Sequence, residues 1–570
     1  MNMKKQGRFR HALELVVLYL AACLFYAWFV HRFTIPVHLG VDEELYISMA
    51  RSFHYEGRFA MNGEVLDYSC CLYSMLLSAA YFFYDPSTIL FHLRLIGVIC
   101  MLSSVFPAYL LADRLLDSRK AVLIVVLATV LTPSMTDTAY CMQETLAYPI
   151  ALWIFYLILR EGEQKDQGVR YSVLIGILCV AAYFVKTYLI VLPAAYVLFE
   201  LMGMPVPGRL DRKVCRRGKV LNCLVSCGIF AVGVLLGREA VLRINGGIPG
   251  VNHYATQFSS LFPLNGQTFL SIQSCLLFYG ICLLFYWGIL PVVAVLRGRR
   301  QEEDSIRQFI RFLFVTGILL VLEIVVTIVV TEEGKPYLPH KFLYRYFQIL
   351  EIPLLCLFMR LLERRTVSLY RRDLWITWGV CGYLALYFYF RGPSMRTAII
   401  DAPLFLLLEN ASRYGNRFAG SLFCLLAGIL VTLVYLRLLR PEGAESVRRR
   451  MPVLLVLFLL GFLGLDVFQL PYYCNKVADG SAIEADAVTI ARMLNDRGIT
   501  TVYYLVGDTD RYEQAVYAYQ KAQTLVRTRQ ELAGTDRSGN IVITAAGTTP
   551  PSDAADLALP LQTLRVYEMR

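Results

Sequence analysis

One short stretch, Leu39–Gly57, decides how the rest of this chain is interpreted. It reads LGVDEELYISMARSFHYEG and contains three consecutive carboxylates, Asp42, Glu43 and Glu44. These acids come soon after an apolar segment that ends near Phe33 and is long enough to cross a bilayer. The sequence therefore places three negative charges where the chain leaves the membrane.

The plainest interpretation of these acids is structural. Asp42 comes two residues after a glycine, and apolar residues at Leu45 and Met49 predict a surface helix that begins here. Asp42 would cap that helix, and Glu43 and Glu44 would lie in its first turn, where the helix dipole favours negative charge. The alternative is a catalytic or binding site, and features elsewhere in the chain favour it.

The composition shows what surrounds this stretch. Of 570 residues, 57% are hydrophobic and 17% are charged, and the mean hydropathy is +0.52. Apolar runs long enough to cross about 30 Å of hydrocarbon recur along most of the chain, which excludes a soluble enzyme with one anchor. The chain is therefore predicted to be an α-helical polytopic membrane protein. Its 15 cysteines lack the spacing of a metal site, and we interpret them as small hydrophobic residues.

About 13 transmembrane helices are predicted, with the N-terminal apolar run retained as the first span. Their expected positions are 12–33, 89–112, 120–138, 145–160, 171–186, 188–203, 219–240, 268–296, 309–330, 344–361, 373–391, 417–438 and 451–471. Alternate loops are rich in arginine and lysine, as is the N-terminus, and the positive-inside rule assigns them to the cytoplasm. The net charge of +11 is thus explained by topology, and nucleic acid is not expected as a partner.

This topology gives a multi-pass protein of the plasma (inner) membrane. Its N-terminus is expected in the cytoplasm and its C-terminus on the extracytoplasmic side. The outer loop 34–88, which contains the three acids, then belongs to a transmembrane module that covers 1–471. Membrane lipids are the expected surroundings of this module.

The tail at 472–570 differs from the module in composition. Helical runs at 483–498 and 511–526 alternate with apolar runs at 499–507 and 540–547. Such alternation is typical of a small α/β domain. We therefore expect an extracytoplasmic α/β domain after the last span.

Further ionisable residues are expected at membrane depth on the outer side. Glu144 stands at the mouth of a span, Lys186 lies between two apolar runs, and His340 and Arg345 flank the start of a later span. Charged residues in such places are costly and usually face a cavity or a partner. Two structural explanations stay open: Glu144 could pair with Lys186, and Arg345 could be a snorkelling anchor. Acids that activate a hydroxyl and bases that hold a leaving phosphate are what group transfer from a lipid phosphate requires.

Several stretches, taken in order and by side, resemble the GT-C superfamily of polytopic glycosyltransferases that use polyprenyl-phosphate-linked sugars. The resemblance is to the bacterial branch similar to protein mannosyltransferases and the lipid A aminoarabinose transferase. The matching stretches are DEELYISMARSFHYEGRF in the first outer loop, HLRLIGVICMLSSVFPAYLLADRLL with Arg94, LTPSMTDTAYCMQETLAYPIALWIFYLIL with Glu144, AAYFVKTYLIVLPAAYVL with Lys186, and YRYFQILEIPLL with Arg345. Together they cover roughly 10–200 and 340–356.

The chain also departs from this family pattern. Where the family often has two prolines in the first loop, this sequence has Cys70 and Cys71. The loops 241–267 and 392–416 resemble nothing in the family. The identity of the acceptor, whether lipid, wall polymer or protein, is therefore left open.

The resemblance implies a role for each matching acid. Asp42 would be the general base that activates the acceptor, or a metal ligand, with Glu43 beside it. Glu144 would support Asp42 or share a metal ion with it. Carboxylates without cysteine or histidine ligands would suit Mg²⁺ or Mn²⁺ better than zinc.

The resemblance likewise assigns the basic residues to the donor phosphate. Lys186 and Arg345 would steady the leaving phosphate, and His340 and Arg94 are further candidates for phosphate binding. The implied activity is a hexosyl or pentosyl transfer, in the cell envelope, from a polyprenyl-phosphate-linked sugar to an acceptor. One carboxylate that acts alone as base implies inversion at the sugar carbon.

Two other functions are open at this stage. The chain could be a transporter or flippase of lipid-linked sugars, a class that commonly shows inverted repeats and midplane sites. It could also be an envelope scaffold that acts through its C-terminal domain. The sequence shows no internal symmetry, and the charges of interest gather near the outer surface, so glycosyl transfer is the preferred hypothesis.

Overall fold

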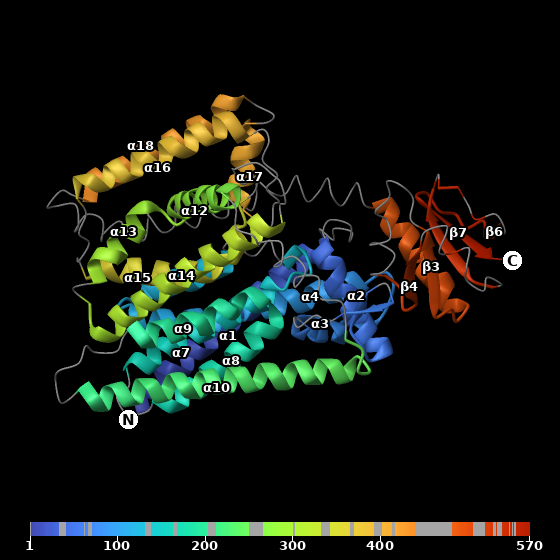
Figure 1. Ribbon diagram of the computed structural model, residues 1–570, viewed down its shortest axis with the longest axis horizontal. Helices are drawn as coiled ribbons and strands as arrows, with labels where there is room; N and C mark the ends of the chain where they lie inside the picture. The colour runs from blue at the N-terminus through green and yellow to red at the C-terminus, as the bar shows by residue number, and fades with distance from the viewer. Residues whose placement is uncertain are drawn as a thin grey trace.

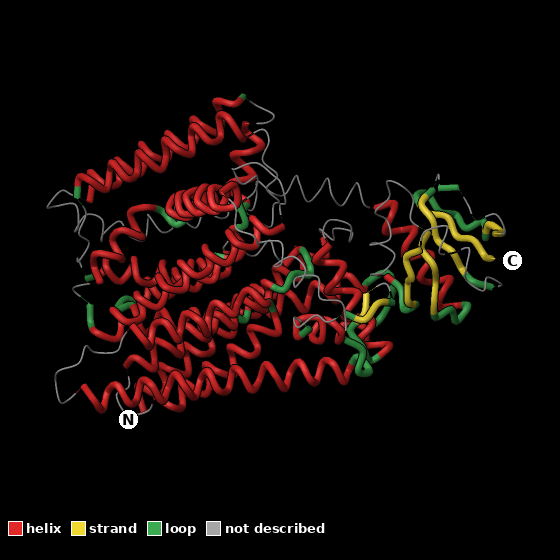
Figure 2. Tube along the Cα trace, viewed as in Figure 1, coloured by secondary structure: helices red, strands yellow, loops and turns green. Residues whose placement is uncertain are grey.

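The computed structural model describes most of the chain. The described residues are 2–32, 41–61, 63–66, 71–131, 138–163, 168–202, 212–249, 266–299, 302–331, 342–364, 370–392, 402–412, 416–438, 481–505, 519–527, 532, 539–546, 548–549, 551 and 554–569. Within them, helices dominate the chain up to residue 438, and strands gather in the C-terminal part, apart from one short hairpin (Figure 2).

The helices lie roughly side by side along the long axis of the molecule (Figure 1). They are α1 (Asn2–Arg32), α2 (Val41–Glu56), α3 (Leu72–Leu77), α4 (Ile89–Leu102), α5 (Val105–Leu115), α6 (Arg119–Leu131), α7 (Glu144–Glu163), α8 (Gly168–Val185), α9 (Val191–Met202), α10 (Arg212–Ile244), α12 (Gly266–Tyr286), α13 (Ile289–Gly298), α14 (Asp304–Thr331), α15 (Glu351–Glu363), α16 (Arg371–Arg391), α17 (Pro403–Asn410) and α18 (Arg417–Leu438). Short 3₁₀ turns lie between helices, among them η1 (Ser78–Phe83), η3 (Thr187–Ile190), η5 (Tyr344–Tyr346) and η6 (Gln348–Leu350). Helix α1 begins at the end of the bundle opposite to the C-terminal strands.

Several of these helices could cross a membrane. Six helical stretches in the described part, one of which is α4 and α5 together, are long and apolar enough to cross a bilayer: Ala12–Arg32, Ile89–Leu115, Lys219–Ile244, Gly266–Tyr286, Asp304–Val329 and Arg417–Val434. On α10, Leu235 and Leu236 are 68% and 66% exposed, a pattern that requires a lipid cover. The chain is a multi-pass membrane protein, as predicted. The number of about 13 spans stays a prediction, because the span expected at 451–471 lies outside the described residues.

Several predicted spans are interrupted, and two of them border the same cavity in the bundle. The span expected at 268–296 breaks between α12 and α13 at Gly288, whose φ of +81° suits glycine and few other residues. The span expected at 344–361 begins instead with the turns η5 and η6, and its α-helix starts only at Glu351. Irregular backbone at membrane depth is tolerated where it is buried in protein or lines a cavity. These breaks therefore direct attention to the space between α12, α14 and α15.

The outer loop folds against the bundle as helices α2 and α3, the turn η1 and a small hairpin. The hairpin pairs β1 (Ala60–Met61) with β2 (Glu64–Val65) in antiparallel register. Asn245, just beyond α10, bonds to both sides of the base of this hairpin. Its Oδ1 accepts the Phe59 N–H at 2.9 Å, and its Nδ2 donates to the Leu66 carbonyl at 3.1 Å. The Asn245 side chain is buried, so a lipid-facing helix and the outer loop are joined through one amide.

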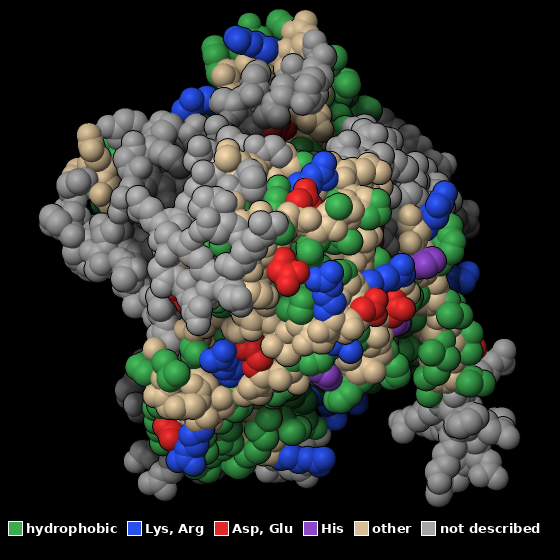
Figure 3. Space-filling view, turned by 90° about the vertical axis from the view of Figure 1, so that its right-hand side faces the viewer, with side chains coloured by type: hydrophobic (Ala, Val, Ile, Leu, Met, Phe, Trp, Pro, Cys, Tyr) green, Lys and Arg blue, Asp and Glu red, His purple; other side chains and the backbone are tan. Residues whose placement is uncertain are grey.

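The C-terminal strands form one mixed sheet. Its members are β3 (Thr501–Leu505), β4 (Gln523–Arg527), β5 (Ile541–Ala545), β6 (Ala554–Asp556) and β7 (Leu564–Met569). Their order is β4-β3-β5-β7-β6, with β3 parallel to β4 and β5, and β7 antiparallel to β5 and β6. On the surface at this end, acidic and basic side chains lie next to one another, as is typical of a face in contact with water (Figure 3).

One helix, residues 481–496, connects this sheet to the outer loop. Ile490 and Leu494 lie one turn apart and pack into the core of the sheet. Ala487 and Ala491, also one turn apart, pack into a different core that contains residues of α2. The helix thus has two apolar faces, one for each partner.

The sequence interpretation of the tail was partly wrong. The run 511–526 was expected to be helical, but its last residues, from Gln523, form strand β4 beside β3. The strand β5 falls within the apolar run expected at 540–547. Pairing with β3 through the backbone outweighs the weak helical periodicity of the run.

Asp486 offers a test of how the sheet is held to this helix. Its carboxylate is buried and accepts the backbone N–H groups of Gln562 and Leu564, each at 3.0 Å, together with that of Thr563. Asp486→Ala leaves these donors without a partner, and we expect it to lower the free energy of unfolding of this part by about 2–4 kcal/mol. Limited proteolysis of the full chain across a urea gradient measures the change. Asp496→Ala, at an exposed position of the same helix, is the matched control, and equal resistance of the two variants would contradict this account.

Candidate active site

Helix α2 turns the three acids of the outer loop in different directions. The side chain of Asp42 is 45% exposed, whereas Glu43 and Glu44 are 2% and 5% exposed. Successive side chains on a helix point about 100° apart, so neighbours in sequence meet different surroundings. Of the three, Asp42 is the one that a molecule from outside can reach.

Glu43 faces the interior of the protein. Its Oε1 accepts the Cys141 N–H at 2.9 Å and lies 3.4 Å from Nη2 of Arg94. Arg94, on α4, is 0% exposed. These contacts tie the start of α2, which carries Asp42, to α4 and to the segment before α7.

Four ionisable side chains from separate parts of the chain meet beside Asp42. Arg345 lies between two carboxylates, with Nη2 3.5 Å from Oδ2 of Asp42 and Nε 3.4 Å from Oε1 of Glu144. Lys186 Nζ is 2.5 Å from the same oxygen of Glu144. We call Asp42, Glu144, Lys186 and Arg345 the acid–base cluster. Its two negative and two positive charges balance, and all of its members except Asp42 are buried.

Local backbone structure explains how these residues meet. Glu144 is the first residue of α7, where the positive end of the helix dipole favours a carboxylate. Lys186 has extended backbone angles at the break between α8 and η3. Arg345 lies in η5, at the second interrupted span. All three therefore stand where a helix begins or breaks, and side chains from different helices can converge there.

Aromatic rings line the basic side of the cluster. The Lys186 ammonium is 4.8 Å from the ring centre of Tyr346 and 5.8 Å from that of Tyr188, and the Arg345 guanidinium is 5.2 Å from the Tyr346 ring. The faces of these rings are electron-rich, so they stabilise buried cations. Lys186 and Arg345 are thus stabilised by ring faces as well as by the carboxylates.

A second buried network lies directly behind Arg345. Tyr344 donates its hydroxyl hydrogen to Glu351, and the indole N–H of Trp287 donates to the Tyr344 oxygen at 3.0 Å. This network holds η5, and so the backbone of Arg345, against α12 and α15. Our sequence reasoning missed it; the available signal was a lone acid, Glu351, within the apolar run ILEIP.

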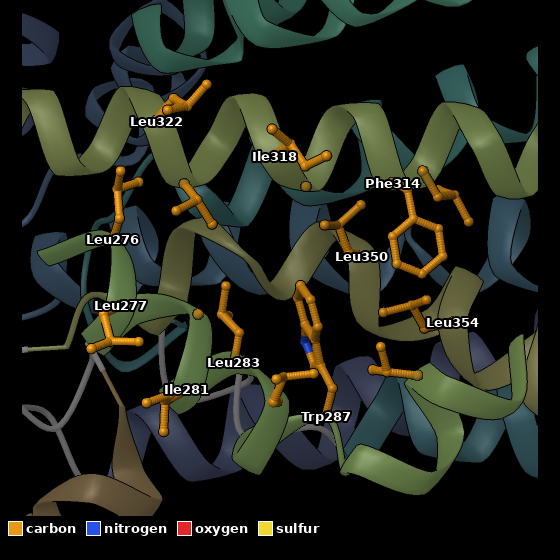
Figure 4. Close-up of a pocket in the computed structure, with 16 residues that line it drawn as sticks. Leu276, Leu277, Ile281, Leu283, Trp287, Phe314, Ile318, Leu322, Leu350 and Leu354 are labelled. Atoms are coloured by element: carbon orange, nitrogen blue, oxygen red, sulfur yellow. The ribbon is translucent and has the colours of Figure 1, made fainter. Parts of the chain in front are cut away.

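An apolar cavity of about 510 Å³ adjoins this network (Figure 4). Trp287 and Leu350 line it, together with residues of α12, α14 and α15, and Figure 4 shows their side chains converging on the space. Its volume falls in the range of about 300–1,000 Å³ found for ligand sites. A hydrocarbon chain would fit in this cavity, with its polar end directed toward Tyr344 and the acid–base cluster.

Known proteins share this architecture. Residues 87–232 match the family described as dolichyl-phosphate-mannose-protein mannosyltransferase. The structure is similar to that of ArnT from Cupriavidus metallidurans in the apo state, with a TM-score of 0.55, 14% sequence identity, and 98% of each chain covered. The chain has the GT-C fold. Similarity to the same ArnT bound to undecaprenyl phosphate gives a TM-score of 0.57 at 14% identity, with 97% of each chain covered. No curated protein sequence matches the chain.

The GT-C fold confirms the resemblance drawn from the outer loop and the spans that follow it. The structure brings Asp42, Glu144, Lys186 and Arg345 together, and it leaves Arg94 buried beside Glu43. Arg94 was expected to bind phosphate, but it could reach a ligand only if the chain moved. His340 lies outside the described residues.

A shared Mg²⁺ or Mn²⁺ ion at Asp42 and Glu144 does not fit the arrangement described here. The Arg345 guanidinium stands between the two carboxylates, and an ion that bridged them would have to displace it. Within the described residues, no three Asp, Glu, His or Cys side chains are grouped as metal ligands. A metal ion at this site stays a prediction from the sequence. The acid–base cluster can carry out proton transfer and phosphate binding with its own side chains.

The pairing within the cluster can be measured by a double-mutant cycle on Glu144→Gln and Lys186→Met. Each single change leaves a buried charge without this partner, whereas the double change removes both charges. We therefore expect a coupling of about 1–3 kcal/mol in the free energy of unfolding, obtained from chemical unfolding in detergent.

The matched control for this cycle is the pair Glu239 and Arg243 on α10. These side chains are 2.8 Å apart but well exposed, so Glu239→Gln with Arg243→Met should show a coupling of about 0.2–1 kcal/mol. Equal couplings in the two pairs would mean that Glu144 and Lys186 do not form a buried ion pair.

Proposed function

We propose that this chain is a membrane glycosyltransferase that moves a hexose or pentose from a polyprenyl phosphate to an acceptor on the outer face of the membrane. The observation that carries the proposal is the position of Arg345, which contacts both Asp42 and Glu144 and follows Tyr344, the residue bonded to Trp287 in the wall of an apolar cavity. A lipid phosphate is bound by cations at its phosphate group and by an apolar space at its hydrocarbon chain. ArnT, which shares the fold, has been solved with undecaprenyl phosphate bound.

The donor would place its phosphate against Lys186 and Arg345 and its first isoprene units in the cavity beside Trp287 and Leu350. The sugar would then lie toward Asp42, the exposed member of the cluster. The acceptor approaches from the outer side, over α2. Water is excluded from the phosphate because the cations that hold it are buried among aromatic rings.

The reaction would be a single displacement with inversion. The Asp42 carboxylate takes the proton of the acceptor hydroxyl, and the acceptor oxygen forms a bond to the anomeric carbon of the sugar. The bond between that carbon and the phosphate oxygen breaks, and the electron pair leaves with the polyprenyl phosphate. When Asp42 takes up the proton it becomes neutral and no longer pairs with Arg345. The Arg345 guanidinium can then pair with the leaving phosphate. Base and leaving group are thus coupled through one guanidinium.

We further propose the topology that this chemistry requires. The N-terminus lies in the cytoplasm, residues 1–471 form the transmembrane catalytic module, and residues 472–570 form an α/β domain on the extracytoplasmic side. In the described part, α1 begins at the end of the bundle opposite to the C-terminal sheet, which supports this arrangement. The sugar and the acceptor are not assigned.

Release of polyprenyl phosphate from lipid-linked sugar donors tests the function directly. The parent chain, purified in detergent with a panel of such donors, should release it in the presence of cell-envelope acceptors. Asp42→Asn removes the base and keeps the size of the side chain, so we expect turnover to fall by about 10²–10⁴-fold. The donor KM should change little, because the phosphate contacts remain.

Glu64→Gln, at an exposed position of the same outer loop, is the control and should keep the parent rate. Turnover by Asp42→Asn at the parent rate would disprove the role of this base. Movement of the lipid-linked sugar across the bilayer, without release of polyprenyl phosphate, would instead establish the transporter.

A further inference from the structure

The C-terminal part of the chain is hydrogen-bonded to helix α2 near the end of the helix that is farther from Asp42. The guanidinium of Arg51, on α2, donates two hydrogen bonds to the carbonyl oxygen of Lys521, from Nε at 3.0 Å and from Nη2 at 2.6 Å. Its remaining nitrogen, Nη1, pairs with Glu56 of the same helix at 2.9 Å. Arg51 is 5% exposed, so these bonds are made away from water and fix the side chain in one geometry.

A second outer-loop residue holds the same segment. The Tyr84 hydroxyl donates to the carbonyl of Tyr519 at 2.8 Å and accepts from Nδ2 of Asn495 at 3.3 Å. The Lys521 ammonium lies 4.7 Å from the centre of the Tyr84 ring. Arg51 and Tyr84 thus bind two nearby carbonyls, those of Tyr519 and Lys521, just before β4 begins. We call these two residues the outer-loop clamp.

Apolar packing continues across this contact. Ala487, Ala491 and Tyr519 share one buried core with Tyr46 and Ile47 of α2. The two alanines present a small surface, so helix 481–496 approaches closely. Tyr519 is 1% exposed and fills the space between the helices. The C-terminal part therefore completes the core that lies under α2.

The same contact reaches the supports of Asp42. The Tyr519 hydroxyl donates to Glu484 at 3.2 Å. Burial raises the pKa of Glu484, and the nearby Arg94 guanidinium counteracts part of that rise. Arg94 is the residue that pairs with Glu43, next to Asp42 on α2. Charges from both domains thus converge on one buried guanidinium.

Helix α2 can transmit a displacement from one end to the other. Asp42 and Arg51 are nine residues apart on one uninterrupted helix, a separation of about 13 Å at 1.5 Å per residue. A helix of this length moves as a rigid rod, held at one end by Glu43 and at the other by the outer-loop clamp. If the outer-loop clamp is released, the orientation of α2 can change. The position of the Asp42 carboxylate then changes with it.

We propose that the C-terminal domain positions the catalytic base, because Arg51 and Tyr84 lock α2 onto the carbonyls of Tyr519 and Lys521. This inference rests on the proposed function, in which Asp42 takes the acceptor proton. Arg51 and Tyr84 are positioning residues: both bind the C-terminal segment, and they act on Asp42 through α2 and the outer loop. The phosphate-binding side chains Lys186 and Arg345 come from other elements of the bundle. Release of the clamp should therefore lower kcat and leave the donor KM nearly unchanged.

Two variants of the full-length chain test the clamp. Arg51→Met keeps an unbranched side chain in place of the arginine stem and removes all of its hydrogen bonds, and Tyr84→Phe removes one hydroxyl from an otherwise unchanged ring. Arg497→Met is the matched control, since Arg497 pairs with Glu568 at 3.3 Å on the exposed surface of the C-terminal part. For Arg51→Met we expect kcat for polyprenyl phosphate release to fall on the order of 10- to 100-fold with a donor KM within about twofold of the parent. Tyr84→Phe should show a smaller fall of the same kind.

Hydrogen exchange of peptides that cover residues 41–56 gives a readout that does not depend on turnover. Arg51→Met should speed exchange along α2, including its first turns, while peptides of α7 and α15 keep the parent rate. Arg497→Met should leave α2 unchanged. Exchange of α2 at the parent rate in Arg51→Met would overturn the inference, even if the parent chain proved to have another activity. Faster exchange of α2 in a chain whose kcat stays at the parent value would overturn it as well, because α2 would then be free without effect on the base.

Discussion

Much of this structure depends on the need to keep four charges balanced at the edge of a hydrocarbon layer. Arg345 satisfies that need by contacting Asp42 and Glu144 together, and Lys186 pairs with the same oxygen of Glu144. A cation in such surroundings is stable only while carboxylates and aromatic faces surround it. Three of the four residues, Glu144, Lys186 and Arg345, stand where a helix begins or breaks, and there side chains from different helices meet.

The sequence allowed this cluster to be predicted because its residues break local patterns. Glu144, Lys186 and Arg345 are charges in apolar runs, and Asp42 begins an acidic run at the end of a span. What the pattern could not predict was the division of labour among neighbours. Glu43 and Asp42 are adjacent in sequence, yet one is buried against Arg94 and the other faces outward. Such a difference depends on where the helix docks, and one sequence does not contain that information.

Long-range contacts were equally beyond prediction. Arg51 and Lys521 are 470 residues apart, and the bond between them uses a backbone carbonyl, which every residue has. The strand β4 was misread for a related reason, since its pairing with β3 is decided by the sheet and not by its own composition. The spans were recognised as a class because hydropathy acts locally, but the breaks at Gly288 and before Glu351 come from packing around the cavity.

The side-chain amide of Asn245 joins the outer loop to α10, a helix with an apolar face exposed to lipid. Helix α10 packs on α8 and has an exposed apolar face that includes Leu235 and Leu236, which lipid would cover. At its outer end, the same amide holds Phe59 and Leu66 at the base of the hairpin that follows α2. Two hydrogen bonds therefore join the lipid-bordering helix to the same outer loop that carries Asp42, so the site and the membrane boundary share one rigid attachment.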